Sequence, residues 1–392
     1  MSSPKESYFD SANLPLKDIP FSSEEIDVRQ QQLQQLFRGF YSSLGYVEHP
    51  PYDIYSKIDP SVLFVGATIS SLKAYLLSEN IPEEGLSILQ PCLRTHTKDY
   101  FYDDSQIADY NSYFTQAGIL ARPDHYEKMC QQSLEFLTNR VGIPPGDIKI
   151  KISPDDIDML QYWDTVIKPV TVEAGQEAAS FYRWQYGLEN VAGRGLTYSI
   201  RFANTEEFRD IGNVICIEKE GRKIGVEWGF GIETLLSRVY DLRKPLETST
   251  ISQLIPFNEG VQEKFSDAVV ATSVMLRSGI EPGKGGAKQI LKVHLNAVRY
   301  LGAKLGFNFE ILEDLINAYE LQEFNDISGI SKNFRQYLEQ YQINTANFSR
   351  SALDIKRSCL QRKVDPAARL EELRRKYGLH TVEAEQILTN IL

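Results

Sequence analysis

An arginine and an aromatic residue in the first third of the chain lie where side chains on neighbouring strands could hold a nucleotide. Arg94 ends a strand-like run that starts at Ile88, and Phe114 lies on the β-rich segment that continues to Leu120. An arginine fixed on a strand can meet a phosphate with a forked, charge-assisted pair of hydrogen bonds. An aromatic ring on the returning strand can cover one face of an adenine. We interpret this pair as one half of an ATP site.

A glycine-rich strand end further along the chain supplies the second half of the predicted site. Gly229 and Gly231 alternate with apolar residues, and the run from Leu235 to Val239 continues as an apolar helix pattern. Glycines let a backbone come close to a nucleotide because no Cβ intervenes. Each motif alone is common, and Arg94 taken alone fits a surface or salt-bridged arginine better. Because the two sets of residues follow each other in this order along the chain, we favour a nucleotide-binding role for Arg94.

Length, hydrophobic content and net charge limit the classes of protein to which the chain can belong. The chain has 392 residues, 42% of them hydrophobic, and a formal net charge of -11. This length can bury a large core and predicts two or three domains. No apolar run of about 18 residues and no signal peptide is found, so we expect a cytoplasmic protein with no membrane contact. The acidic balance argues against indiscriminate polyanion binding but leaves room for a local basic surface.

The four cysteines and five histidines are scattered along the chain. None of them lies at the spacing of a metal or redox motif, so the sequence predicts a reducing compartment and no protein-held metal site.

Periodicity predicts an α+β fold. From residue 46 to about residue 240, short β-rich runs and a hairpin signal favour an antiparallel sheet flanked by helices. Beyond Pro245 the pattern becomes almost purely helical. The predicted units are a flexible arm (1–21), a domain with the ATP site (22–245), an all-helical domain (246–345) and a basic helical tail (346–392).

The motifs in this order resemble the catalytic core of the alanyl-tRNA synthetases, a family of class II aminoacyl-tRNA synthetases. Residues 28–45 look like the family's opening helix, and residues 58–67 are similar to its "DPTLLFTNAGM" segment. Residues 91–94 are similar to its "QRCVRAGG". Residues 267–306 look like the family's helical tRNA-acceptor region, so the resemblance implies a truncated paralogue with catalytic and acceptor-binding regions only.

The resemblance implies an activity. The protein would use ATP and Mg²⁺ to adenylate a small amino acid, alanine or one like it, and transfer the acyl group to a tRNA. Arg94 would contact the α-phosphate and the amino-acid carboxylate, while Phe114, Gly229 and Gly231 would hold the nucleotide. Such an enzyme supplies position and charge rather than a nucleophile.

Three residues match the family's amino-acid pocket. Asn213 and Glu227 lie at the positions that grip the amino acid, and Trp163 matches the pocket tryptophan. From the residues alone, they fit a strand-end turn residue, a solvated acid and a core tryptophan equally well or better. Glu227 stands where the family has aspartate, and one extra methylene in a small pocket is worth about 1 to 3 kcal/mol. Alanine specificity is therefore in question.

Two substitutions affect the ATP site. Thr115 replaces an acid that faces ATP through magnesium in the family, and Thr234 replaces an arginine that contacts the γ-phosphate. Arg238 lies one helical turn beyond Thr234 and shares its helix face, so we expect it to replace that arginine in part. The family's "GPCGPC" loop is also missing. A regulatory or scaffold protein without catalysis is therefore an alternative.

The predicted RNA-binding residues are sparse. The family's arginine-dense helix is reduced to Lys288, Lys292, His294 and Arg299, and the loss of phosphate contacts weakens binding. Residues 350–376 carry nine Lys or Arg against four Asp or Glu, which fits a solvated helix face and an RNA surface equally well. The acyl acceptor is therefore a tRNA or, as an alternative, a carrier-protein thiol or a small amine. The sequence leaves open whether the chain forms a homo-oligomer.

Overall fold

The computed structural model describes residue 16 and residues 22–55, 57–166, 170–185, 190–257, 260–362 and 365–390. Apart from Leu16, the predicted arm at residues 1–21 lies outside the described residues, as does Lys363 of the basic stretch.

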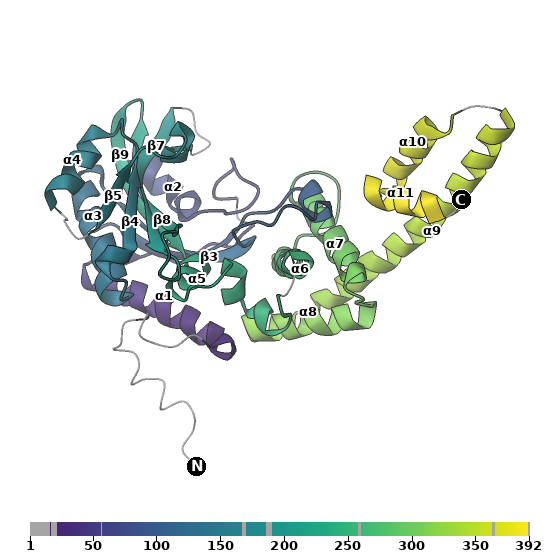
Figure 1. The fold of residues 1–392 in the computed structure, drawn as a ribbon, viewed down its shortest axis with the longest axis horizontal. Helices are drawn as coiled ribbons and strands as arrows, with labels where there is room; N and C mark the ends of the chain where they lie inside the picture. The colour runs from purple at the N-terminus through teal and green to yellow at the C-terminus, as the bar shows by residue number, and fades with distance from the viewer. Residues whose placement is uncertain are drawn as a thin grey trace, which may run out of the picture.

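Within this part of the chain, nine strands form one sheet (Figure 1). The strands are β1 (Val47–Glu48), β2 (Leu86–Leu93), β3 (Tyr113–Ala121), β4 (Ile148–Ile152), β5 (Thr171–Ala174), β6 (Arg183–Gln185), β7 (Val191–Arg201), β8 (Phe208–Lys219) and β9 (Arg222–Gly231). Their order is β1-β2-β3-β9-β8-β7-β4-β5, and β6 pairs with β7. The central pairs are antiparallel, as predicted, but both edge pairs, β1 with β2 and β4 with β5, are parallel.

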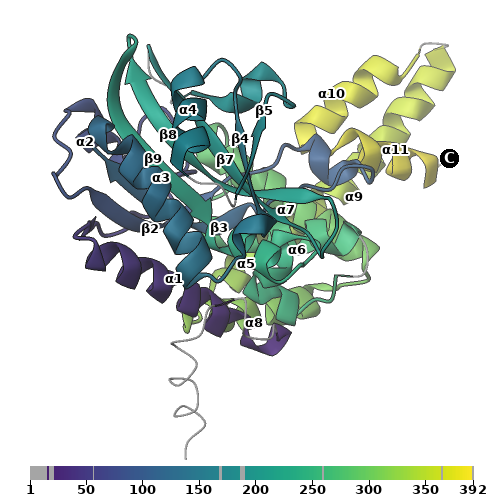
Figure 2. The ribbon, with the colours of Figure 1, turned by 60° about the vertical axis from the view of Figure 1, so that its left-hand side comes forward.

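Helices cover both faces of the sheet. They are α1 (Ile26–Ser43), α2 (Thr68–Leu77), α3 (Tyr126–Glu135), α4 (Ile157–Val166) and α5 (Ile232–Val239). On β2, Leu89 packs in the apolar cluster of α1, α3, α4 and α5, whereas Ile88 packs in the cluster of α2. Consecutive strand residues point to opposite faces, so α2 lies on the face opposite the other four helices (Figures 1 and 2).

The chain beyond the sheet is helical, as predicted. It contains α6 (Gly260–Arg277), α7 (Gly286–Lys304), α8 (Phe309–Phe324), α9 (Ile330–Arg362), α10 (Ala367–Tyr377) and α11 (Thr381–Asn390). The core of α6 to α9 also includes Ile54, Phe64, Leu93 and Phe101, so this region packs against the sheet region. Together the two regions confirm the α+β class.

Helix α9 is continuous across the predicted boundary at residues 345 and 346. Its second half packs with α10 and α11 around a small cluster that includes Phe348, Leu373 and Leu379, and α10 folds back along it (Figure 1). None of the described helices is long and apolar enough to cross a bilayer.

Candidate active site

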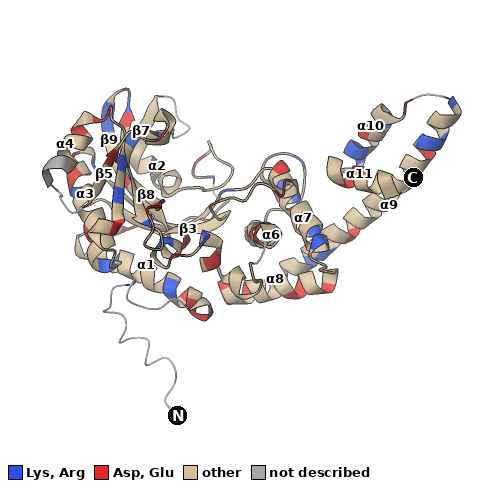
Figure 3. Ribbon diagram, in the orientation of Figure 1, with Lys and Arg blue, Asp and Glu red and all other residues tan. Residues whose placement is uncertain are grey.

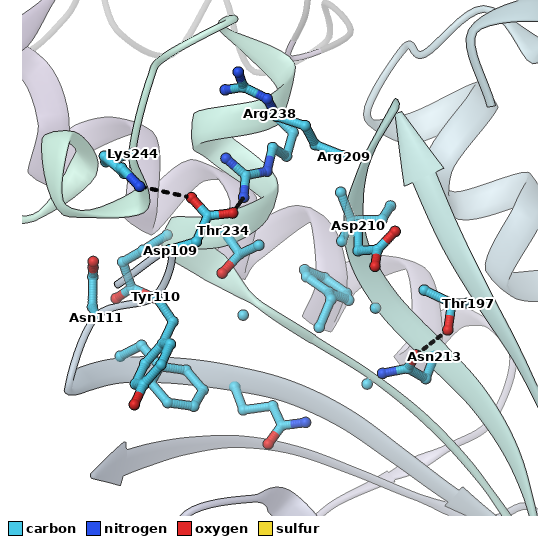
Figure 4. Close-up of a pocket in the computed structure, with 18 of the residues that line it drawn as sticks. Asp109, Tyr110, Asn111, Thr197, Arg209, Asp210, Asn213, Thr234, Arg238 and Lys244 are labelled. Carbon is cyan, nitrogen blue, oxygen red and sulfur yellow. Dashed lines mark hydrogen bonds and ion pairs between the residues drawn. The ribbon is translucent and has the colours of Figure 1, made fainter. Parts of the chain in front are cut away.

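A cleft of about 790 Å³ lies over the sheet where β3, β9 and β8 run side by side (Figure 4). The five residues predicted to hold the nucleotide, Arg94, Phe114, Gly229, Gly231 and Arg238, all line it. They come from β3, β9, α5 and the end of β2, so the fold brings both predicted halves of the site to one cavity.

Arg94 lies just beyond β2. Its backbone N–H donates a hydrogen bond to the carbonyl of Ser112, which extends the pairing of β2 with β3. Its side-chain Nε donates to the carbonyl of Gly66 at 2.8 Å, and its guanidinium carbon lies 5.0 Å from the ring centre of Phe114. The side chain is exposed to the cleft. Arg94 is thus aimed by the backbone of the 58–67 segment while its charge faces the cavity.

The glycines of β9 allow close packing beside the cleft. A Cβ at Gly229 would lie 2.8 Å from Nε2 of Gln116, and one at Gly231 would lie 3.1 Å from Oγ1 of Thr234. Any larger residue at Gly229 would push the side chain of Gln116, whose Oε1 accepts a hydrogen bond from the backbone N–H of Thr68. Glycine therefore keeps β9 in contact with the side chains around it.

Glu233, at the first turn of α5, is a cleft residue that the sequence prediction missed. Both of its carboxylate oxygens lie within hydrogen-bond distance of the Thr115 N–H, at 3.2 and 3.1 Å. The residue is 7% exposed, and burial raises the pKa of Glu233 to about 8 although the Thr115 hydrogen bond lowers it. Its only signal in the sequence was its place within the glycine-rich segment.

Three charged residues meet at one end of the cleft (Figure 4). Arg238 Nη2 lies 3.4 Å from Asp109 Oδ2, and Lys244 Nζ lies 3.3 Å from Asp109 Oδ1. Arg238 has only 4% of its side chain exposed, and its Nε and Nη1 have no hydrogen-bond partner among the described residues. Burial lowers the pKa of Arg238. Burying a cation whose N–H donors are unpaired costs folding free energy unless an anion accepts those hydrogen bonds.

Arg209, at the start of β8, adds another cation to this wall. Its Nη1 donates to the carbonyls of Leu242 and Arg243 at 3.3 Å, and its guanidinium carbon lies 3.4 Å from the ring centre of Phe202. Asp109, Arg209 and Lys244 were not predicted, because they come from three segments whose spacing forms no recognisable motif.

A second cavity, of about 320 Å³, adjoins the first. Asn213 and Glu227 both line it, and Arg94, Gln116, Trp184, Asn213 and Gly229 line both cavities. Asn213 accepts a hydrogen bond from Thr197 at 2.8 Å (Figure 4), and buried Glu227 accepts one from Thr68 at 3.1 Å. Glu227 faces Ile215 across the β8–β9 pair, two residues from Asn213, so both side chains lie on one face of the sheet.

Trp163 does not belong to either cavity. It is fully buried on α4, with its ring 5.5 Å from that of Tyr162 and 6.3 Å from that of Tyr198. Its helix turns this side chain into the core under the sheet, so the prediction of a pocket tryptophan at Trp163 is wrong. Trp184 on β6 lines both cavities instead.

The predicted RNA-binding residues of α7 differ in accessibility. Lys288 is exposed and Lys292 is half-buried. Arg299, with 18% of its side chain exposed, forms an ion pair with Glu383 of α11, and buried His294 has its pKa lowered to about 4 by burial. Of the predicted RNA-binding residues Lys288, Lys292 and Arg299, the structure therefore shows Arg299 paired with Glu383 of α11 and not as a free cation, and His294 is neutral in the core.

The basic stretch at residues 350–376 is partly neutralised. Arg374 and Arg375 both pair with Glu371, at 2.7 and 2.8 Å. Acidic and basic segments alternate along α9 and α10 (Figure 3). The structure thus leaves fewer free cations here than the sequence count suggested.

No group of three or more His, Cys, Asp or Glu side chains that could hold a metal ion occurs in the described part of the chain. Glu233 is the acid beside Thr115, but its raised pKa favours a neutral carboxyl. The described residues thus place one carboxyl beside Thr115 and no cluster of metal ligands, which suits a magnesium ion held mainly by substrate phosphates.

Comparison with known proteins finds similarity to the tRNA synthetases. The family model described as tRNA synthetases class II (A) matches residues 32–209. The alanine–tRNA ligase of Acetivibrio thermocellus is 20% identical over 324 residues, which cover 72% of this chain and 36% of the relative. That of Desulfitobacterium hafniense is 21% identical over 375 residues, covering 85% and 42%. The chain spans less than half the length of these relatives.

Among solved structures, the RNA binding domain of threonyl-tRNA synthetase from Cryptosporidium parvum matches with a TM-score of 0.39 and 10% identity. The match covers 54% of this chain and 64% of that one. A likeness of this size carries no argument about activity.

Proposed function

We propose that this chain, an alanyl-tRNA synthetase-related member of the class II tRNA synthetases, activates an amino acid with ATP and transfers the acyl group to a tRNA. The observation that carries the proposal is the position of Arg94 on the wall shared by the two cavities. Adenylation needs one cation that meets the α-phosphate and the attacking carboxylate together. Both cavities are in the size range of small-molecule sites.

In the first step, a carboxylate oxygen of the amino acid attacks the α-phosphorus of ATP, and pyrophosphate leaves. Arg94 at the junction would stabilise the charge on the α-phosphate. Phe114 would cover the adenine, and Gly229 and Gly231 would let the nucleotide approach β9. Arg238, with its unused donors, supports a role at the far phosphates together with Lys244.

The second cavity would hold the amino acid. Glu227, fixed by Thr68, would pair with the substrate ammonium, and Asn213 would orient the group beside it. Trp184 takes the place proposed for Trp163 in the wall between the cavities. Because Glu227 is longer than aspartate and the cavity has about 320 Å³, alanine is one candidate substrate among the small amino acids.

Magnesium is proposed only as the counter-ion that the triphosphate carries. We assign ATP and amino-acid chemistry to residues 22–245, acceptor binding to residues 246–345 and a supporting role to the tail at 346–392, in a cytoplasmic enzyme.

A carrier-protein thiol or a small amine is the alternative acceptor. The ion pair of Arg299 with Glu383 and the burial of His294 favour it, since Lys288 and Lys292 are then the members of the predicted α7 set with a free charge for a phosphate backbone. Such acceptors need fewer cationic contacts than a tRNA does.

Pyrophosphate exchange with each amino acid, followed by acyl transfer to total tRNA, tests the proposal. Exchange with one small amino acid and a labelled tRNA product are the expected results. Exchange without tRNA charging would support the alternative acceptor. No exchange and no heat of ATP binding by calorimetry would point to the non-catalytic regulatory or scaffold protein.

A further inference from the structure

Helix α11 contacts the segment that leads into the larger cleft. Its Glu383 accepts hydrogen bonds from the hydroxyls of Tyr102 and Tyr341, each at 2.9 Å. The ring of His380, just before α11, stacks on the ring of Tyr102 with 3.6 Å between centroids. Tyr102 ends the short 3-10 helix η4 (Asp99–Tyr102), which lies 281 positions before Glu383 in the chain. The last described helix is therefore bonded to the sheet region.

Residues 103–112 run from η4 to the wall of the cleft, which residues 109–111 line. The ring of His96 stacks on Tyr100 of η4 at 3.9 Å and on Tyr110 at 4.9 Å. The Tyr110 hydroxyl also lies 3.2 Å from His96 Nδ1. Ring contacts thus connect η4 to the cleft wall.

Helix α6 holds both ends of this loop. Buried Lys264 donates to the carbonyl of Tyr100 at 2.6 Å and to that of Asp103. Asp267, on the same helix, accepts the N–H and the hydroxyl of Ser112 at 2.7 and 2.5 Å. Lys264 thus holds the backbone on both sides of Tyr102, and the hydrogen bond to Glu383 fixes the direction of the Tyr102 side chain.

We propose that Glu383 is a positioning residue for the ATP cleft, acting through Tyr102 on η4 and on the loop that carries Asp109 opposite Arg238 and Lys244. The inference rests on the proposed ATP-dependent function. Loss of the Tyr102 bond removes one of the contacts that hold η4, so the loop that follows η4 positions Asp109 less firmly against the two cations. None of residues 103–112 lines the amino-acid cavity, so binding of the amino acid should be unaffected.

The test uses three variants of the full chain. Tyr102→Phe removes the hydroxyl and keeps the ring, whereas Glu383→Gln removes the charge that pairs with Arg299. Glu385→Gln, exposed on the same helix, is the control. In pyrophosphate exchange we expect about a fivefold rise in KM for ATP in the first two variants, as loss of one hydrogen bond implies, with the amino-acid KM and the control unchanged.

Amide hydrogen exchange of residues 103–112 gives a second measurement that needs no turnover. Faster exchange in Tyr102→Phe and Glu383→Gln, but not in Glu385→Gln, is the expected result. The proposal is overturned if amide hydrogen exchange of residues 103–112 is unchanged in Tyr102→Phe. It is also overturned if the KM for ATP and the KM for the amino acid rise equally in that variant. Both outcomes can be read even if Glu383→Gln fails to fold. If no amino acid supports pyrophosphate exchange by the wild type, the proposed function fails. The amide hydrogen-exchange measurement still decides whether Glu383 controls the loop.

Discussion

The guanidinium of Arg94 lies over the ring of Phe114, with Cζ 5.0 Å from the ring centre. An exposed contact of this kind is worth about 0.5 to 1 kcal/mol. A charge-assisted, forked bond to a phosphate is stronger. Under the proposed function, ATP would draw Arg94 away from the ring at a net gain and so uncover Phe114 for the adenine. Arg94 lines both cavities, so its charge lies near the proposed positions of both substrates.

Replacing Arg94 by alanine should reduce the rate of pyrophosphate exchange by about 10² to 10³, as removal of one preorganised charge-stabilising donor does in other enzymes. Arg94→Lys keeps the charge without the fork and should recover only part of the rate. Arg335→Ala is the control, because Arg335 is a half-exposed arginine of α9 paired with Glu339. Equal rates for Arg94→Ala and the control would contradict the assignment.

Residues on paired strands were the predictable part of the site. Phe114 and Gly231 lie on β3 and β9, strands whose apolar runs and glycines can be read locally. Their grouping around one cleft follows once those strands pair, while their roles stay proposals. The hairpin signal predicted the antiparallel β8–β9 pair, but the antiparallel β3–β9 pair and both parallel edge pairs join strands that are separated by other elements of the chain. Local periodicity carries no information about such partners.

The errors have the same physical origin. Arg299 looked free because nothing within α7 pairs with it, yet its partner Glu383 lies 84 residues later. Trp163 and Trp184 are equally large and apolar, and only the packing of α4 decides which one reaches the core. Asp109 meets Lys244 from 135 residues away. Each case depends on tertiary contacts that override local pattern.

Glu227→Asp should change which amino acid is preferred. Shortening the side chain enlarges the cavity by about one methylene, so kcat/KM for a larger substrate should rise relative to alanine, by an amount equivalent to about 1 to 3 kcal/mol. Pyrophosphate exchange with a series of small amino acids measures the ratio. Glu220→Asp, at the exposed hairpin turn, is the matched control. An unchanged ratio in Glu227→Asp would mean that Glu227 does not contact the substrate.

Glu233→Gln should change the pH dependence of stability. The pKa of Glu233 is about 8 in the fold against an ordinary value of 4.5, so the folded protein keeps a proton that the unfolded chain loses. The contribution of Glu233 is therefore fully present below pH 4.5 and is lost as pH rises toward 8. The variant should gain stability relative to wild type across that window. Urea unfolding at several pH values measures the difference in free energy of unfolding between Glu233→Gln and wild type. If that difference does not change with pH, the pKa of Glu233 is not raised.

Arg238→Met should separate ATP binding from folding. The buried guanidinium has unused donors, so an apolar side chain of similar length should leave the free energy of unfolding unchanged or raise it by about 1 kcal/mol. The KM for ATP should rise, because the cation at the phosphate end of the cleft is lost. Urea unfolding and ATP titration by calorimetry give the two values. A less stable variant with normal ATP affinity would assign Arg238 to structure alone.

Binding of tRNA, if it uses α7, should depend on Lys288 and Lys292. The affinity falls as salt rises, with a slope of about -0.9 for each phosphate contact on a duplex. Replacing both lysines by alanine should make that slope smaller by about two. Arg299→Ala should instead lower stability and leave the slope unchanged, since Arg299 is paired with Glu383. A gel-shift series with total tRNA measures all three proteins. An enzyme that activates an amino acid but binds no tRNA even at low salt must pass the acyl group to a carrier thiol or a small amine, because a transferase cannot charge an acceptor that it does not hold.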